Sequence, residues 1–471
     1  MVLYTAKDAA ADRDPRRFHM LPPQGIAGWV DASAGELQAA YGHIDAQHRA
    51  PCVLGQTPLV VHRMTVLGIA NDINYVIRSH ALSVRKTNGG QLLLLPPARA
   101  PAHGRVASNN RAALANGRGL HNPWHWLDGV PNASLATIFT PSSCQTLLQH
   151  PDNVPRLRAL DVGSRNGTLA ATAERLGLGA NVIDASQAVR AIGRGMLLSE
   201  IPLAFRHHGM LWWWQALTTY LVRVREPVAT RLRQHPAMRA LLARSSGSGD
   251  GPDVTRQREW LDLSRLALRR AIANGDRADR GGVGDEEDGL GWIPSAAFDA
   301  ALHIRMGDAC GPRAKRNQGV VRKCVLSLRA GLAPLLAHGV VPRGGQVFLA
   351  TDSQSIAKEA DRAAAQLPFE VFHLRLDRGK YDSEAWIELA SARKHAQSAV
   401  LEETLLDVLL LSRARYIAGS MYGNVPRLAL QLRPTAPGDL RRLSYITTDG
   451  RDWCTSPSAW SHTTIEYAIL P

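Results

Sequence analysis

The chain has 471 residues, of which 45% are hydrophobic and 20% are charged. This length exceeds the needs of one ordinary hydrophobic core and predicts two globular domains of about 150 to 250 residues each. No stretch reaches the roughly 18 apolar residues of a membrane-spanning helix. Residues 1–15 carry charges of both signs and no apolar run of signal-peptide type, so either the protein is not secreted by that route or its targeting segment lies outside this sequence.

The net charge of +14 has two readings. It can serve solubility, or it can give affinity for polyanions or phosphorylated ligands. The Lys and Arg residues are spread along the chain, and no signature of a nucleic-acid-binding module accompanies them. We therefore expect no nucleic-acid partner, and a basic polyanion-binding protein stays as an alternative.

Five cysteines are present, at positions 52, 144, 310, 324 and 454. None of them forms a CxxC pair, so we expect no zinc site. Cys310 and Cys324 bracket a short loop and helix and could be bridged, which would imply an oxidising compartment. The odd number leaves at least one thiol free or paired outside the chain.

The first half of the chain mixes helical and strand patterns. Residues 1–50 are predicted to be a tail with a short helical patch at 34–47. Hydrophobic spacing predicts helices at 66–83 and 211–225 and strands at 91–95, 158–162 and 181–184. Flexible loops are expected near 244–253 and 276–290, the second with an acidic cluster that we interpret as solvated surface.

The second half alternates regularly. Strands are predicted at 301–305, 346–350, 369–374 and 415–418, and helices at 320–338, 353–366, 401–412 and 424–432. Such alternation builds right-handed βαβ units on a parallel sheet. Ligands of these sheets bind at the carboxyl ends of the strands.

Polar residues gather where three of these strands end. The first strand runs into His303, Arg305 and Asp308, and the second runs into Asp352. The last strand is followed by Ser420, Tyr422, Gly423 and Asn424 and by a helix that carries Arg427. Because these ends share one edge of a parallel sheet, the sequence predicts a binding cleft there.

These segments resemble the shared motifs of the α1,6-fucosyltransferase-like family, which uses GDP-fucose and is related to the α1,2- and protein O-fucosyltransferases. The segments are HIRMGD at 303–308, VFLATDS at 347–353, LLDVLLLS at 405–412 and GSMYGNVPRLALQL at 419–432. In the first half, the residues 67–95, the tryptophan segment ending in Ser-Ser-Cys144 and the segment 209–227 are similar to further family motifs. The resemblance spans about residues 55–455 and keeps the family's order.

The resemblance implies an α/β, GT-B-like fold with two Rossmann-type domains whose parallel sheets face a central cleft. The acceptor side would be residues 51–297, the GDP-sugar-binding domain 298–456 and a C-terminal tail 457–471. It implies inverting transfer of fucose from GDP-fucose to a hydroxyl of a glycan or glycoprotein, without metal or cofactor. It also implies the Golgi lumen or the secretory pathway as the compartment.

Three of the candidate residues have a functional and an ordinary reading, and a fourth, Asp308, has a functional reading only. Arg305 would bind the diphosphate and stabilise the departing GDP, or it is a surface ion-pair partner. His303 contacts the sugar or a phosphate, or is a packed core histidine. Asp352 lies near the nucleotide, caps the following helix, or does both. Asp308 is a candidate catalytic base, and the first domain is the other source of that base.

Asp407 lies in a helix that is apolar on nearly every face, so its carboxylate is expected to be buried and to need a partner. Guanine presents an N1–H and an N2 amino group side by side, which match one carboxylate. The alternative partner is a nearby arginine such as Arg413 or Arg415.

The turn at residues 419–424 precedes a helix N-terminus, which is an anion-binding feature. The resemblance implies that Ser420, Tyr422, Gly423, Asn424 and Arg427 hold the β-phosphate of the donor.

The sequence also departs from the family. Met306 stands where the first motif has a second arginine, Tyr422-Gly-Asn replaces Ser-Ser-Gln, and Arg313 falls on the glutamate of core α1,6-fucosyltransferases. A catalytically inactive glycan- or guanine-nucleotide-binding relative is therefore the main alternative. A protein O-fucosyltransferase, or a methyltransferase suggested by the glycine loop at 160–167, are further alternatives.

Overall fold

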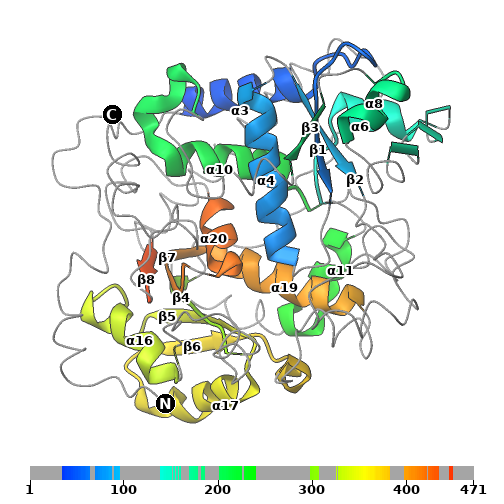
Figure 1. Cartoon of the computed structure of the whole chain (residues 1–471). Helices are drawn as coiled ribbons and strands as arrows, with labels where there is room; N and C mark the ends of the chain where they lie inside the picture. The colour runs from blue at the N-terminus through cyan, green and yellow to red at the C-terminus, as the bar shows by residue number, and fades with distance from the viewer. Residues whose placement is uncertain are drawn as a thin grey trace, which may run out of the picture.

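The computed structural model describes residues 34–63, 69–86, 90–95, 138–150, 152–153, 155–156, 159–160, 169–178, 182–185, 201–224, 228–239, 298–306, 325, 327–381, 397–421, 423–433 and 445–448. Helices and strands alternate through these residues and form two separate sheets (Figure 1). Both sheets are parallel throughout, which confirms the α/β class.

The first sheet has three strands in the order β2-β1-β3. They are β1 (Leu59–Arg63), β2 (Gln91–Leu95) and β3 (Val182–Asp184). Side chains of β1 alternate between two faces, because successive residues of a strand point in opposite directions. Leu59 and Val61 pack with α6 (Ser143–Gln149) and α8 (Leu169–Arg175), and Val60 packs on the opposite side.

The opposite face of this sheet is covered by three longer helices. They are α3 (Ala34–His48), α4 (Ile69–Lys86) and α10 (Gly209–Leu221), the last preceded by the 3-10 helix η4 (Leu203–His208). Trp212, Trp213 and Trp214 of α10 are all buried there. The helix α3 is part of this core, although it lies in the segment 1–50 that we expected to be a tail.

The second sheet has five strands in the order β6-β5-β4-β7-β8. They are β4 (Phe298–Ile304), β5 (Gln346–Thr351), β6 (Glu370–His373), β7 (Ala414–Gly419) and β8 (Tyr445–Thr447). The central strand β4 places His303 opposite Ala350 on one side and Gly419 on the other. The ends of β4, β5 and β7 therefore lie next to one another.

Helices cover both faces of the second sheet. On one face, α16 (Leu328–Ala337) and α17 (Gln354–Ala363), which continues into the 3-10 helix η5 (Ala364–Gln366), pack on Leu302 and Ile304. On the other face, α19 (Gln397–Ser412) and α20 (Asn424–Gln431) pack on Ala301. Doubly covered parallel sheets are typical of α/β proteins.

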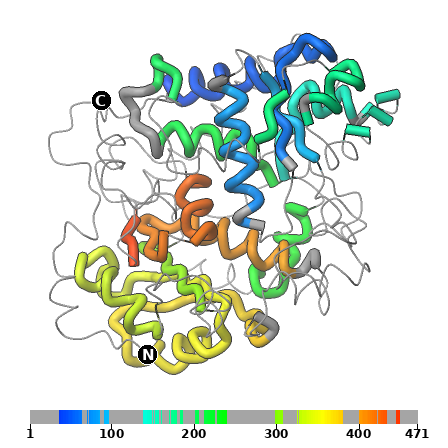
Figure 2. Tube along the Cα trace, viewed as in Figure 1, coloured from blue at the N-terminus to red at the C-terminus, as the bar shows by residue number. Residues whose placement is uncertain are grey.

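The helices between the two sheets share one hydrophobic core. Buried residues of α3, α4 and α10 belong to the same cluster as those of α19 and α20. The helix α4 extends from the first sheet to α20 (Figure 1), and the tube in Figure 2 shows the same course. An ion pair adds to this contact, because Arg231 of α11 (Val228–Gln234) donates to Glu402 of α19 at 2.6 Å.

A disulfide joins Cys52, just before β1, to Cys144 at the start of α6. The cysteine spacing did not predict this pairing, since the two residues are 92 positions apart. The pairing of Cys310 with Cys324 that we considered lies outside the described residues.

Most predicted elements agree with the structure to within a few residues, and two need correction. The helix predicted from residue 320 begins at Leu328 in the described residues. Ser327 caps this start, because its side chain accepts a hydrogen bond from the Ala330 backbone N–H at 3.1 Å. The strand predicted at 158–162 has helical backbone at 159–160, and these two residues do not pair into a sheet. Within the described part of the chain, no helix has the length and apolar character needed to cross a membrane.

Candidate functional site

The carboxyl ends of β4, β5 and β7 carry the residues that the sequence singled out. Arg305 follows the last residue of β4, Asp352 follows β5 and Ser420 follows β7. The register pairs Ile304 with Thr351 and brings the first two of these ends together. The described site residues thus collect at one edge of the five-stranded sheet.

His303 is buried near this edge, with 7% of its surface exposed. Burial, and after it the positive charges of Arg305 and Arg378, lower the pKa of His303 to about 3. Its ring is therefore neutral at physiological pH, and both guanidinium groups lie within electrostatic reach of it. Among the described residues, its Nδ1 atom has no hydrogen-bond partner.

Gly419 is wedged between His303 and α20. A Cβ atom at position 419 would lie 3.3 Å from the Cβ of His303 and 3.2 Å from the Cβ of Pro426. These distances are shorter than ordinary van der Waals contacts, so there is no room for a side chain at position 419. The strands β4 and β7 and the first turn of α20 are therefore packed closely around Gly419. The start of α20 and His303 are thus in close packing with the same residue.

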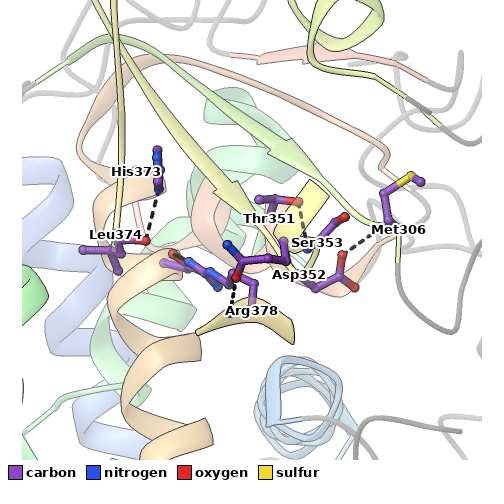
Figure 3. A network of polar contacts seen from close by, with 9 residues as sticks. Met306, Thr351, Asp352, Ser353, His373, Leu374 and Arg378 are labelled. Atoms are coloured by element: carbon purple, nitrogen blue, oxygen red, sulfur yellow. Dashed lines mark hydrogen bonds and ion pairs between the residues drawn. The ribbon is translucent and has the colours of Figure 1, made fainter. Parts of the chain in front are cut away.

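Asp352 connects the ends of two strands. Its Oδ1 atom accepts a hydrogen bond from the backbone N–H of Met306 at 2.7 Å (Figure 3). Ser353 occupies the N-cap position of α17, and no side chain makes a capping hydrogen bond there. The helix-capping role considered for Asp352 is therefore not seen, and the carboxylate fixes the end of β4 instead.

Asp407 is buried in α19 and is held by an arginine. The Arg378 guanidinium donates to both carboxylate oxygens, from Nη1 at 2.8 Å and from Nη2 at 3.1 Å. Burial raises the pKa of Asp407, and Arg378 opposes this rise. The burial that we predicted is confirmed, and the arginine partner is Arg378, 29 residues away, where we had considered Arg413 or Arg415.

Arg378 is the residue of this edge that the sequence analysis missed. It begins the 3-10 helix η6 (Arg378–Tyr381), only 3% exposed, and its backbone N–H donates to Gln354 Oε1 at 2.9 Å. Figure 3 shows it close to Asp352 and Met306, although it hydrogen-bonds to Gln354 and Asp407. The sequence indicated only that the buried carboxylate of Asp407 needs a cationic partner, and it did not identify Arg378 as that partner.

The residues after β7 lead directly into the N-terminus of α20, as the sequence predicted. Gly423 occupies the N-cap position of α20, and its N–H donates to the Ser420 carbonyl at 2.9 Å. Arg427 is buried within the helix. The carbonyl oxygen of Asn424 accepts a hydrogen bond from Asn74 of α4 at 3.1 Å, so the first half of the chain contacts this turn directly.

The described residues thus bring His303, Arg305, Asp352 and Asp407 to one edge. Asp308 and Tyr422 lie outside the described residues, as do both predicted loops. The Arg305 guanidinium beside a neutral, buried imidazole suits an anionic ligand, because charge-assisted hydrogen bonds from arginine match the oxygens of a phosphate, while the charge of Arg378 is compensated by Asp407. Both oxygens of Asp407, however, are already occupied by Arg378.

Comparison with known proteins adds no relative. No model of a known protein family matches the chain. A search of curated proteins also finds no match.

Proposed function

We propose that this chain is a glycosyltransferase that transfers fucose from GDP-fucose to a hydroxyl group of a glycan or glycoprotein. The five-stranded half binds the donor and the three-stranded half faces the acceptor, in a GT-B-like arrangement. The observation that carries the proposal is the gathering of Arg305 and the neutral His303, next to the Arg378–Asp407 ion pair, at the carboxyl edge of a parallel sheet. The family-like order of the sequence motifs supports the same donor.

The diphosphate of the donor would bind beside Arg305 and the N-terminus of α20. Backbone N–H groups at a helix N-terminus favour negative charge, and a guanidinium adds a fixed fork of donors. A charge-assisted hydrogen bond of this kind contributes roughly 1.5 to 3 kcal/mol. As the bond from the fucosyl carbon to the diphosphate oxygen breaks, GDP leaves with the bonding electrons, and Arg305 stabilises the charge that develops on it.

The acceptor oxygen would attack the same fucosyl carbon from the opposite side while a base takes its proton. Asp308 and a residue of the first half are the two sources of that base. In this proposal Asp407 holds Arg378 in place, and guanine reaches Asp407 only where Arg378 moves away. Preference for guanine therefore requires either that exchange or other contacts to the base.

Binding of GDP tests the donor site most directly. Calorimetry with GDP, ADP and UDP in the presence of chelator should detect GDP in preference to the other two. The Arg305→Ala variant should bind GDP about 10- to 100-fold more weakly, since it loses a charge-assisted contact. Arg329→Ala is the matched control, because Arg329 is an exposed arginine of α16, which covers the face of the same sheet opposite to α20.

Turnover is measured with GDP-fucose and a pool of glycan acceptors, by release of GDP. Acceptor-dependent release from the wild-type chain, and its loss in Arg305→Ala but not in Arg329→Ala, is the expected result. No binding of GDP together with no release from GDP-fucose would overturn the proposal.

A second candidate is a guanine-nucleotide-binding relative without transferase activity. Met306 favours this candidate, because its side chain stands where the resemblance has a second arginine. The hydrogen bond that Met306 makes to Asp352 comes from its backbone N–H and not from its side chain. This candidate predicts GDP binding of ordinary affinity and no turnover with any acceptor. The two measurements above therefore separate the candidates.

A further inference from the structure

Helix α20 is held at both ends by amide side chains from the first half of the chain. Asn74 of α4 donates to the carbonyl oxygen of Asn424, the first residue of α20, at 3.1 Å. Gln215 of α10 donates to the carbonyl oxygen of Leu430, near the other end, at 3.0 Å. Both amides are buried, at 7% and 3% exposed, and Figure 1 shows α20 beside α4 and α10.

Asn74 uses both hydrogens of its amide group in this arrangement. The second bond goes to the carbonyl oxygen of Ala70 in its own helix, at 2.8 Å. The nitrogen is thus fixed to a rigid element on one side and to the start of α20 on the other. A buried polar group with its bonds satisfied specifies one arrangement of its neighbours, because any shift leaves it unsatisfied at a cost.

The contact at Asn424 reaches the candidate site through close packing. Pro426 lies two residues after Asn424 in α20. A Cβ atom placed on Gly419 would lie 3.2 Å from the Cβ of Pro426 and 3.3 Å from the Cβ of His303, so both residues pack closely on Gly419. The imidazole at the end of this series is buried, and its Nδ1 atom has no partner among the described residues. The contact at Leu430 lies at the opposite end of α20, away from Asn424 and Gly419.

We propose that Asn74 is a positioning residue for the donor site, which sets the start of α20 and, through Gly419, His303 by its bond to Asn424. The proposal rests on the function proposed above, and it assigns to the first half of the chain a part in donor binding. Gln215 makes the same kind of bond and stabilises the same helix, but it does not position the site.

Two single variants separate positioning from stability. Asn74→Ala and Gln215→Ala each remove one buried amide that joins the halves, so they should lower the midpoint of thermal unfolding by similar amounts. Asn74→Ala should also weaken GDP binding about fivefold or more, because the released start of α20 must be ordered again when the nucleotide binds. Gln215→Ala should bind GDP within about twofold of wild type.

Asn74→Ser keeps the proposal testable if the alanine variant does not fold. A serine hydroxyl bonds the carbonyl four residues earlier in its own helix, so the bond to Ala70 is retained and only the bond to Asn424 is lost. Its GDP affinity should fall as in Asn74→Ala. With GDP-fucose as substrate, its KM should rise, while Gln215→Ala should leave the KM unchanged.

The outcomes are distinct. If wild type binds GDP and the Asn74 variants bind it equally well, or if Gln215→Ala weakens binding to the same extent, the positioning role is wrong and the proposed function stands. If wild type does not bind GDP, the proposed function falls, and the positioning role falls with it.

Discussion

Arg378 and Asp407 form a deeply buried ion pair of the candidate site, with two hydrogen bonds between them. A buried pair of this kind is a weak source of stability, since desolvation of both charges offsets their attraction. Replacing only one of the two residues is costly, because the charge of the other then remains in the interior without a counter-ion. The pair therefore fixes η6 against α19 more than it stabilises the fold.

Arg378→Leu should lower the free energy of unfolding by about 3 to 5 kcal/mol at pH 7.5. The deficit should shrink as the pH falls toward 4.5. Without the arginine, burial raises the pKa of Asp407 in the folded state, so the folded chain takes up a proton at a higher pH than the unfolded chain, and the penalty disappears near the unfolded pKa. Urea denaturation across this pH range measures the effect.

The double variant Arg378→Leu with Asp407→Leu is the control for this prediction. It removes both charges and should recover most of the lost stability at pH 7.5, with no added dependence on pH. A deficit of Arg378→Leu that is constant from pH 7.5 to pH 4.5 would contradict the assignment of the effect to Asp407.

The residue types of the site could be predicted from the sequence, and their partners could not. His303, Arg305 and Asp352 lie at the ends of buried strands, and the hydrophobic pattern of those strands is enough to place them at a sheet edge. The carboxylate of Asp407 was expected to be buried because apolar residues surround it in the sequence. Arg378 lies in a different loop, and only the folded chain brings it to Asp407.

At the scale of elements, the disulfide connects the segment before β1 to α6. It closes a loop with a sequence separation of 92. Cross-linking restricts the unfolded chain, and for a loop of this length the loop-entropy estimate of the stabilisation is at most about 4.6 kcal/mol, with about 4 kcal/mol at the upper end of typical disulfides. The bond also joins two elements on the outer face of the first sheet, where Cys144 is fully buried.

Cys52→Ser combined with Cys144→Ser should therefore lower the free energy of unfolding by about 4 kcal/mol under oxidising conditions. Denaturant unfolding with and without reductant measures it. Reductant should destabilise wild type by a similar amount and leave the double variant unchanged. A double variant as stable as wild type would show that the bond does not form in solution.

The elements themselves differ in how well the sequence predicts them. The strands β2, β5 and β7 were located to within a residue or two because each is a short buried run next to a helical pattern. The strand β1 was not predicted, since Leu59–Arg63 includes two polar residues. The strand β8 (Tyr445–Thr447) was not predicted either. The start of α16 at Leu328 depends on the capping serine, which outweighs an apolar pattern that continues upstream.

At the scale of the whole molecule, the two sheets share one core. Buried side chains of α4 and α10 meet those of α19 and α20 without a break. The boundary near residue 297 that the sequence suggested therefore separates two sheets, while the hydrophobic interior crosses it. Domains that move independently usually meet across smaller and more polar surfaces.

We expect the chain to unfold in a single cooperative transition. Scanning calorimetry should give one peak, with a calorimetric enthalpy equal to the van't Hoff enthalpy. Trp213→Ala, a large-to-small change in α10, should lower the stability by about 3 to 5 kcal/mol. Amide hydrogen exchange should then speed up in β4 as well as in β1.

Two resolved peaks, or faster exchange confined to the first sheet in Trp213→Ala, would contradict a common core. An exposed change in the same half, Leu203→Ala, is the control, because Leu203 is 78% exposed and its loss should leave both sheets unaffected.

The position of α4 has a thermodynamic consequence. If the proposed function holds, an acceptor that binds the first sheet and restrains α4 also restrains the start of α20, so it lowers the entropy that nucleotide binding must remove. The coupling is reciprocal by linkage: whatever factor an acceptor adds to nucleotide affinity, the nucleotide adds to acceptor affinity. Acceptors could therefore be recognised by screening glycans for their effect on GDP binding, without waiting for product to form.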